Sequence, residues 1–326
     1  MIKSIIKKFN SIWNYFPAYV QRYIWPLPKF RKEVVVMVDG KQVHGGLTDR
    51  FRNILSVYQF CKEYNIHFYL HYNYPCELTE ILVPNEYDWR ISTKDLSYNY
   101  LDSKEIYLFV KGTNSMWESS GERLYNNNLH LSILKDNCLK QRRIQFHEYG
   151  NAYFAQGSYN HLFNELFRPS SYLQDRLDRA QCALPTDYES VTLRFQQLLG
   201  DFIETGYDVL SFADKELLIS SCIDKINHLY LSGYFSTDKI LVTSDSQYFL
   251  KRISDLEFVC VVPGRMEHMD YTHDTDLEMN SKSFVDLFLL MRAKKLTLLK
   301  TGKMYKSGFP EFAAELGEKP YEVIIF

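Results

Sequence analysis

Apolar positions along this chain switch repeatedly between continuous runs and a spacing close to the helical period. Continuous runs of four to eight residues are typical of strands that are buried on both faces. In the first half such runs predict strands at 34–39, 66–72, 105–110 and 143–149. In the second half they predict strands at 190–195, 239–244, 257–262, 295–300 and 321–326. Helical spacing between the later runs predicts helices at about 213–231, 246–253, 281–293 and 309–316.

Strands and helices that alternate in this way predict parallel, right-handed βαβ units. The alternation occurs in two blocks, so we expect an α/β fold made of two Rossmann-like lobes. The predicted boundaries are 33–185 for the first lobe and 186–326 for the second, after an N-terminal amphipathic segment at 1–32. Ligands of such folds bind beyond the carboxyl ends of the strands, which here predicts a site in the cleft between the lobes.

The N-terminal segment combines apolar residues at helical spacing with basic residues. It holds seven of the 38 Lys and Arg residues of the chain and none of its 40 acidic residues. Residues 1–24 can therefore form a helix on an anionic membrane surface, or a helix that packs on its own domain. No signal-peptide pattern and no membrane-spanning run is present, so we expect a cytoplasmic protein that is peripheral on the inner membrane if the first interpretation holds.

Composition argues against several classes of function and of site. The body of the chain is acidic, which argues against nucleic-acid binding, because phosphate contacts need clustered Lys and Arg. Six scattered cysteines without histidine partners argue against a disulfide framework or a zinc site and favour a reducing cytoplasm. The loop at 263–276 mixes His and Asp residues without matching a known ligand spacing, so no metal is expected there.

The first candidate site is the turn HGGLTDR, His44 to Arg50, between the first strand and a helix. Gly45 and Gly46 allow a close approach of the backbone to a ligand, and the helix N-terminus attracts anions such as phosphates. Asp49 would be a base and Arg50 a phosphate or sugar contact. The alternative is a tight turn in which Thr48 or Asp49 caps the helix.

The second candidate is Arg194, at the end of the first strand of the second lobe. A guanidinium at that position can bind a pyrophosphate through two parallel hydrogen bonds. The alternative is a structural ion pair with Asp201.

Three later segments complete the candidate donor site. Ser244, Asp245 and Ser246 follow a strand, where they can hold a ribose and base or cap the next helix. Asp286 lies on an apolar helix, and a polar loop with three lysines ends in Ser307 and Gly308. That loop suits a diphosphate, or it is a solvated charged loop.

In this order the segments resemble the GT-B-like fucosyltransferases, which include bacterial α-1,2 and α-1,6 enzymes, plant cell-wall enzymes and protein O-fucosyltransferases. In that family an Arg at the place of Arg194 binds the β-phosphate of GDP-fucose, and an acid such as Asp201 often follows. Thr192-Leu193-Arg194-Phe195 lacks the His and the second Arg of the family pattern, and Asp49 stands where related enzymes often have Asn. The C-terminal segment TGKMYKSGFPEFAA is similar to proteins of Bacteroidetes polysaccharide loci.

The resemblance implies a metal-independent glycosyltransferase with a nucleotide-sugar donor and a glycan acceptor, and no further cofactor. Its implied reaction is an inverting transfer of fucose from GDP-fucose to a glycan hydroxyl in surface-polysaccharide synthesis. Gly45, Gly46, Arg50, Arg194, Ser244, Asp245, Ser246, Asp286, Ser307 and Gly308 would bind the donor, and Asp49 and Arg194 would be catalytic. The alternatives are another nucleotide sugar, or a non-catalytic glycan-binding or assembly protein with the same fold.

Overall fold

A computed structural model describes residues 16–17, 19–23, 28–108, 127–140, 144–202, 208–264, 269 and 276–326. Contacts divide these residues into two compact units. Unit 1 contains the described residues up to His44, Arg52–Tyr72 and those from Asp88 to Gln156. Unit 2 contains Gly45–Phe51, Asn73–Tyr87 and the described residues from Gly157 on. The predicted boundaries at 33, 185 and 186 stay predictions.

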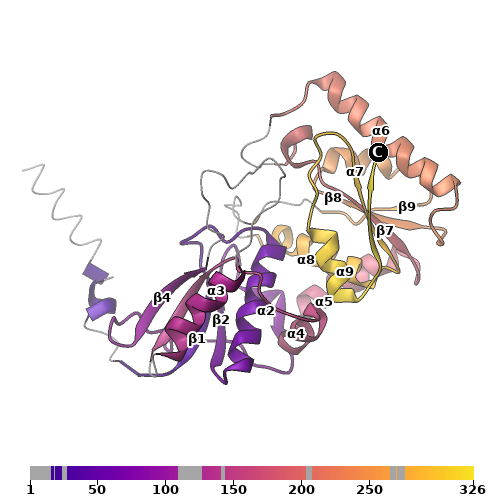
Figure 1. The fold of residues 1–326 in the computed structure, drawn as a ribbon. Helices are drawn as coiled ribbons and strands as arrows, with labels where there is room; N and C mark the ends of the chain where they lie inside the picture. The colour runs from indigo at the N-terminus through magenta and orange to yellow at the C-terminus, as the bar shows by residue number, and fades with distance from the viewer. Residues whose placement is uncertain are drawn as a thin grey trace, which may run out of the picture. The chain divides into compact units, whose positions relative to one another are not determined.

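Unit 1 is built on a four-stranded parallel sheet with the strand order β2-β1-β5-β4 (Figure 1). Its elements are β1 (Glu33–Val38), the larger part of α2 (Leu47–Glu63), β2 (His67–Tyr72), β4 (Ser103–Leu108), α3 (Asn127–Leu134), a π-helical turn (Lys135–Leu139) and β5 (Gln145–Gly150). Every residue of β1 is buried, as its continuous apolar run predicts. The apolar side of α2 is buried too, because it packs on the sheet, where the Tyr58 ring lies 5.1 Å from that of Phe68.

Polar residues of α2 hold the chain that leaves β5. The amide of Asn53 donates to Glu148 Oε2 over 2.8 Å and accepts from the Ala152 backbone N–H, also over 2.8 Å. Ser56 Oγ accepts from the next backbone N–H groups, those of Phe154 and Ala155. Glu148 is completely buried, and its burial raises the pKa of its carboxyl to about 8, although the Asn53 hydrogen bond opposes the shift.

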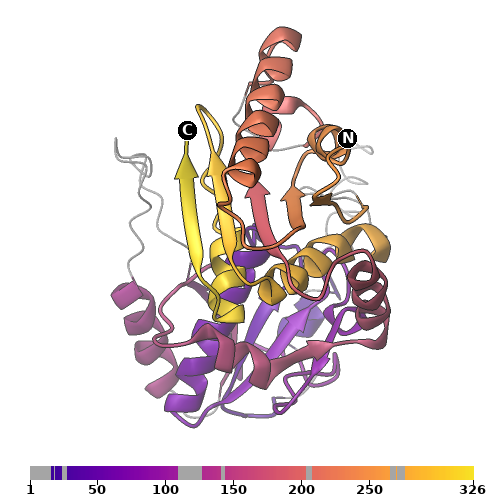
Figure 2. The same ribbon diagram turned by 90° about the vertical axis from the view of Figure 1, so that its right-hand side faces the viewer.

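Unit 2 contains a five-stranded parallel sheet with the order β11-β10-β7-β8-β9 (Figure 2). The strands of this sheet are β7 (Glu189–Leu193), β8 (Ile240–Ser244), β9 (Val259–Cys260), β10 (Leu296–Lys300) and β11 (Tyr321–Ile325). The helices are α4 (Tyr159–Leu166), α5 (Ser171–Cys182), α6 (Phe212–Leu231), α7 (Gln247–Ile253), α8 (Leu277–Arg292) and α9 (Phe309–Gly317). Short 3-10 helices cover Leu78–Glu80 and Gln196–Leu199, and β3 (Leu82–Pro84) pairs antiparallel with β6 (Phe167–Pro169).

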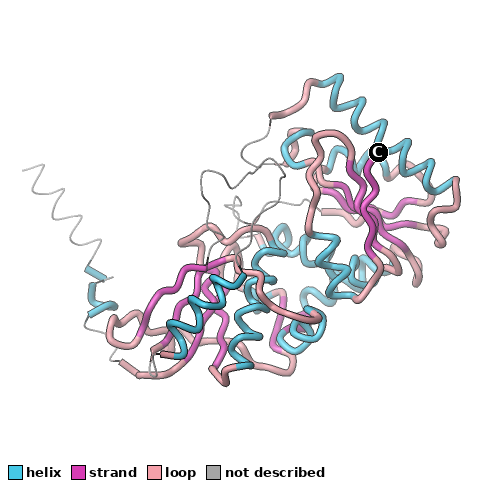
Figure 3. Tube along the Cα trace, viewed as in Figure 1, coloured by secondary structure: helices cyan, strands magenta, loops and turns pink. Residues whose placement is uncertain are grey.

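The order of the five strands is that of a Rossmann sheet. Counted along the chain as first to fifth, the strands lie in the order 3-2-1-4-5. The strands β8 and β9 are therefore added on one side of β7, and β10 and β11 on its other side. Such a reversal opens a crevice between the carboxyl ends of the two central strands. Figure 3 shows helices alternating with strands in both units. Two Rossmann-like α/β lobes, as the apolar pattern predicts, are therefore confirmed.

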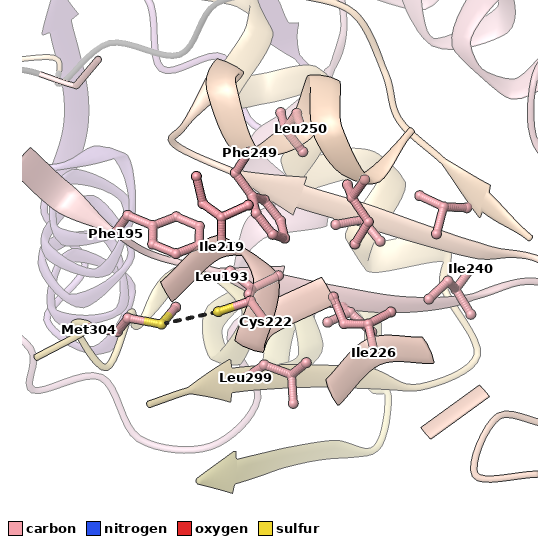
Figure 4. Packing of buried hydrophobic residues seen from close by; sticks show 14 of the residues in the cluster. Leu193, Phe195, Ile219, Cys222, Ile226, Ile240, Phe249, Leu250, Leu299 and Met304 are labelled. Atoms are coloured by element: carbon pink, nitrogen blue, oxygen red, sulfur yellow. Dashed lines mark hydrogen bonds between the residues drawn. The ribbon is translucent and has the colours of Figure 1, made fainter. Parts of the chain in front are cut away.

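One core cluster of unit 2 lies between the sheet and the helices α6 and α7 (Figure 4). Met304, from the loop between β10 and α9, inserts into this cluster, where its sulfur lies 3.8 Å from Cys222 Sγ. Only 2% of Met304 is exposed, whereas Lys303 and Lys306 in the same loop are exposed. Met304 therefore anchors the loop and leaves its lysines in solvent.

Replacing Met304 with alanine is expected to destabilise unit 2 by about 2–5 kcal/mol, because the truncation leaves a cavity and frees the loop. Denaturant unfolding followed by circular dichroism measures this loss. Met304→Leu, which nearly conserves the volume, is the control and should cost less than about 1.5 kcal/mol. Equal losses for both variants would contradict the anchoring role.

Some element ends differ from the predicted ones, each for a local reason. Helix α8 begins at Leu277 rather than near 281, because Asp276 caps it and accepts from the Glu278 N–H over 2.9 Å. Strand β7 ends at Leu193 rather than at 195, because the N–H groups of Phe195 and Gln196 donate to the carboxylate of Asp245 instead of to a neighbouring strand. Of the expected N-terminal helix, residues 16–17 and 19–23 are helical. The rest, and most of the loop at 263–276, lies outside the described residues.

Candidate active site

The carboxyl ends of β7 and β10, where the strand order reverses, are the first place to look for a ligand in unit 2. Arg194 directly follows β7, and its carbonyl accepts from the backbone N–H of Tyr305, in the loop after β10, over 3.2 Å. The two carboxyl ends are therefore in contact through their backbones. Ser244 pairs with Leu193 in the sheet, so the end of β8 reaches the same edge.

The side chain of Arg194 is fixed on two sides. Its Nε lies 3.3 Å from Asp245 Oδ2, and its Cζ lies 4.2 Å from the centre of the Phe202 ring. A guanidinium stacked on an aromatic face and paired with a carboxylate keeps its planar fork in one orientation. Because 18% of the side chain is exposed, Arg194 can meet a ligand from solvent.

The carboxylate of Asp245 bonds to neighbouring groups of the protein and does not face solvent. Its side chain is fully buried, and its two oxygens accept from the N–H groups of Phe195 over 2.9 Å and Gln196 over 2.7 Å. Burial raises the pKa of Asp245, while the Arg194 charge and these N–H groups oppose the shift. Gln196 has a left-handed backbone with φ of 53°, which this carboxylate helps to hold. Asp245 thus ends β7 and orients Arg194.

The neighbouring hydroxyls complete a local network. Ser246 caps α7, since its Oγ accepts from the Phe249 N–H, and the same hydroxyl donates to Asp201 Oδ2 over 2.9 Å. Ser244 Oγ accepts from the Ser246 N–H over 3.2 Å. The capping alternative is therefore present at Ser246. Asp201 accepts from Ser246 and Tyr248, and the acid that lies beside Arg194 is Asp245, not the Asp201 of the structural alternative.

Ser307 and Gly308 lie where the loop after β10 enters α9. Ser307 is buried, and its Oγ accepts from the Phe309 N–H over 3.2 Å, while Gly308 precedes the first helical residue. The start of α9 therefore follows closely on Tyr305, whose N–H donates to the Arg194 carbonyl. Exposed Lys303 and Lys306 add positive charge to this loop.

The turn at Gly45 and Gly46 also belongs to unit 2. Gly45 has φ of 78°, and a Cβ there would come within 2.9 Å of Asp49 Cβ, so only glycine fits. Asp49 Oδ2 accepts from the Gly46 N–H over 3.2 Å, which is the bond that the third helical residue makes in a capping box. The helix-cap alternative is thus present for Asp49, and its role as a base stays a prediction.

Arg50 has a structural role that its sequence position did not reveal. Only 1% of the residue is exposed. Its Nε donates to the Gly45 carbonyl over 3.0 Å and its Nη1 to the Tyr74 carbonyl over 2.7 Å. Arg50 therefore closes the turn onto the segment at 73–87, and its predicted contact with a donor stays a prediction.

The residue after Arg50 joins this turn to the second half of the chain. The ring of Phe51 lies 6.4 Å from that of Phe312 on α9 and 6.1 Å from that of Phe284 on α8. The ring of Phe51 therefore lies near both α8 and α9 within unit 2. All predicted donor-binding residues fall in this one unit.

Asp286 is placed differently from the others. It is completely buried on α8 and forms an ion pair with Lys282, one helical turn earlier, which is itself 3% exposed. Burial raises the pKa of Asp286, and the Lys282 ammonium opposes the shift. A Cβ at Gly264 would meet the Lys282 side chain at 2.8 Å, so the chain packs closely over this pair. The structure thus places Asp286 in the interior of unit 2.

Phe202 is the residue of this site that sequence analysis missed. Its position in the same segment as Arg194 was visible, but aromatic residues are common in this chain, and nothing in the pattern marks one that stacks on a guanidinium. Within the described residues no group of three or more His, Cys, Asp or Glu side chains is arranged to hold a metal ion. None of the described helices has both the length and the apolar composition that a bilayer crossing requires.

Comparison with known proteins gives structural matches only. No model of a protein family and no curated protein matches the sequence. A NodZ α-1,6-fucosyltransferase soaked with GDP-fucose matches with a TM-score of 0.54 and 12% identity, over 88% of this chain and 93% of that one. The fucosyltransferase NodZ from Bradyrhizobium matches at 0.52 and 12%, over 87% and 92%. POFUT1 in complex with GDP-fucose is more distant, at 0.47 and 11%, over 92% and 99%. The fold is thus similar to that of the NodZ fucosyltransferase.

Proposed function

We propose that this chain is an inverting glycosyltransferase that transfers fucose from GDP-fucose to a glycan hydroxyl during the synthesis of a bacterial surface polysaccharide. The observation that carries the proposal is Arg194, oriented by Asp245 and Phe202 at the crevice where the strand order reverses. A guanidinium at that crevice matches the charge and shape of a diphosphate. The likeness of fold to a NodZ fucosyltransferase soaked with GDP-fucose supports the choice of donor.

In the proposed reaction the acceptor hydroxyl oxygen attacks the anomeric carbon of fucose from the face opposite GDP. The bond from that carbon to the β-phosphate oxygen breaks, and GDP leaves with the electron pair. Asp49 takes the acceptor proton as general base. Arg194, the turn at Gly45 and Gly46 and the loop at Ser307 stabilise the charge that develops on the diphosphate, in the place of a metal ion.

The remaining donor contacts are proposed from the resemblance of these segments to the fucosyltransferases. The ribose and base lie against the end of β8, and the diphosphate lies against the loop that follows β10. The proposed donor residues are Gly45, Gly46, Arg50, Arg194, Ser244, Asp245, Ser246, Asp286, Ser307 and Gly308. Residues 33–185 are proposed as the acceptor lobe and 186–326 as the donor lobe.

Nucleotide-dependent stabilisation tests the donor. GDP at about 100 times its dissociation constant should raise the free energy of unfolding by about 2.7 kcal/mol, which is a few degrees in Tm. UDP and dTDP at the same concentration should give a much smaller shift. A larger shift with UDP or dTDP would assign another nucleotide sugar. No shift with any nucleotide, together with retained binding of a glycan, would identify a non-catalytic glycan-binding protein.

We also infer that the chain works in the cytoplasm as a peripheral protein on the inner membrane, where lipid-linked glycan acceptors are presented. The support is the excess of basic residues in residues 1–32.

A further inference from the structure

A group of large apolar side chains in unit 1 is half exposed although three of its members have their rings in contact. Tyr19, Tyr23, Tyr100 and Leu101 are 55%, 49%, 51% and 50% exposed, and we call these four residues the aromatic patch. The Tyr23 ring lies 4.9 Å from the Tyr19 ring and 5.2 Å from the Tyr100 ring. Isolated exposed apolar residues are ordinary, but a contiguous group calls for an explanation.

The aromatic patch combines two segments that are far apart in the sequence. Tyr19 and Tyr23 lie on the helical residues 19–23, drawn in indigo in Figure 1, and Tyr100 and Leu101 lie on the loop before β4. The two segments are joined by a backbone hydrogen bond of 3.0 Å from Tyr100 N–H to the Arg22 carbonyl. The patch is therefore one surface.

Hydrogen bonds of Asn99 and Asp102 hold the loop that carries Tyr100 and Leu101. Asn99 Oδ1 accepts from the Leu101 N–H over 3.0 Å, and the Asn99 carbonyl accepts from Ser103 Oγ over 2.7 Å. Asp102 is buried and accepts from the backbone N–H groups of Lys29 and Phe30 and from Ser97 Oγ. These hydrogen bonds already hold the loop in one conformation with Tyr100 and Leu101 exposed. Binding through these two residues would therefore not pay the entropy of ordering the loop.

The chemistry around the patch points to an anionic lipid surface. Tyrosine has an apolar ring and a polar hydroxyl, so it suits the level of lipid headgroups. Arg22, whose carbonyl accepts from the Tyr100 N–H, is exposed, and residues 1–32 carry seven basic residues and no acid. Lys29 and Arg31 share Asp95 as an ion-pair partner, so the net attraction comes mainly from the other five cations. The negative surface potential of an anionic leaflet attracts basic residues close to it, so such a segment is an effective electrostatic anchor.

We propose that the aromatic patch is a membrane-docking surface, in which Tyr100 and Leu101 insert among the headgroups of an anionic bilayer beside the N-terminal segment. The inference deepens the membrane part of the proposed function, and it does not depend on the transfer reaction. Its new element is the loop before β4, which sequence analysis had not connected with the membrane.

Vesicle flotation of the full chain tests the proposal without nucleotide or glycan. Vesicles of phosphatidylglycerol and phosphatidylcholine should bind the protein, and phosphatidylcholine alone should bind it weakly. The double variant Tyr100→Ser, Leu101→Ser should bind at least about tenfold more weakly to the anionic vesicles. The matched control is Phe212→Ser, Leu231→Ser on α6, whose side chains are 77% and 75% exposed, and it should bind as the unmodified protein does.

A local probe reports which surface enters the bilayer. Cys182 is exposed and the other five cysteines are buried, so Cys182→Ser provides a background for single labelling. An environment-sensitive fluorophore on Leu101→Cys should shift to the blue and brighten on anionic vesicles. The same fluorophore on Leu217→Cys of α6, where the side chain is 71% exposed, should not change.

Three outcomes would overturn the proposal. Equal vesicle binding by the loop variant and the unmodified protein would show that the loop is not part of the membrane-docking surface. A fluorophore at position 101 that is already shielded without vesicles, in a monomer, would mean that residues 1–15 cover the patch. Loss of dimerisation in the loop variant, measured by light scattering, would assign the patch to a second copy of the chain. Each leaves GDP-dependent stabilisation unaffected, so failure here is separate from failure of the transferase proposal.

Discussion

Replacing Arg194 with alanine is expected to lower kcat/KM for GDP-fucose at least about 100-fold and to weaken GDP binding, because the diphosphate loses its charged partner. Donor hydrolysis or transfer to a glycan acceptor measures the first effect, and nucleotide-dependent stabilisation measures the second. Arg194→Lys keeps the charge but not the planar fork, so it should recover only part of the activity.

The variant must be separated from a folding defect, because it leaves Asp245 buried without its cation. Removing one partner of a buried ion pair costs about 3–5 kcal/mol. Arg194→Ala combined with Asp245→Asn avoids the unpaired charge and should remain folded and inactive. Arg252→Ala is the control, since this Arg pairs with Glu216 at the surface. Full activity in the folded double variant would exclude Arg194 from the donor site and favour a protein that binds glycans without transferring them.

Glu148 is expected to make the stability of the protein depend on pH. Its carboxyl has a pKa of about 8 in the folded chain against 4.5 when unperturbed. Between these values the unfolded chain releases the proton and the folded chain keeps it, so the free energy of unfolding falls as pH rises from 4.5 to about 8. At about 1.36 kcal/mol per pKa unit, the whole fall is at most about 5 kcal/mol.

Glu148→Gln should remove this dependence, because the amide has the same shape, cannot ionise and can still accept from Asn53. Urea unfolding at intervals between pH 5 and 9 measures the slope, and the variant should gain most at the alkaline end. Glu105→Gln, at an exposed carboxyl on β4, is the control and should change little. Parallel curves for Glu148→Gln and the unmodified protein would show that Glu148 ionises without cost to the fold.

Sequence patterns located the strands of both parallel sheets, and most accurately the buried ones such as β1 and β8, because a buried parallel strand needs an unbroken apolar run. They missed the short strands β3 and β6 and predicted β9 too long. They could not give the order of the strands. The crevice between β7 and β10 depends on which strands pair, and pairing is decided by packing among segments about a hundred residues apart. The same holds for Arg194 and Asp245, which meet because Leu193 and Ser244 are in register.

Burial was the other quantity that the sequence did not yield at the site. Arg50 and Asp245 were assigned to the donor because they are charged and lie near the ends of predicted elements, and Asp286 was assigned because its helix resembles one in the fucosyltransferases. In the folded chain all three are buried and bonded to neighbouring groups of the protein. A charged residue can be buried when its partners come from the local backbone or from the next helical turn, as with Lys282 and Asp286. Charge alone therefore indicates a site less well than charge with exposure.

The anchoring of the loop after β10 by Met304 has a consequence for redox chemistry. The side chain that anchors this loop in the core is a thioether, and its neighbour Cys222 is a thiol. Oxidation of Met304 to the sulfoxide would place a polar, chiral group in the cluster that now holds it. Because the sulfur is buried, oxidants reach it only when the loop opens locally. The rate at which Met304 is oxidised therefore reports how often the loop opens. A bound nucleotide that stabilises the loop would lower this rate.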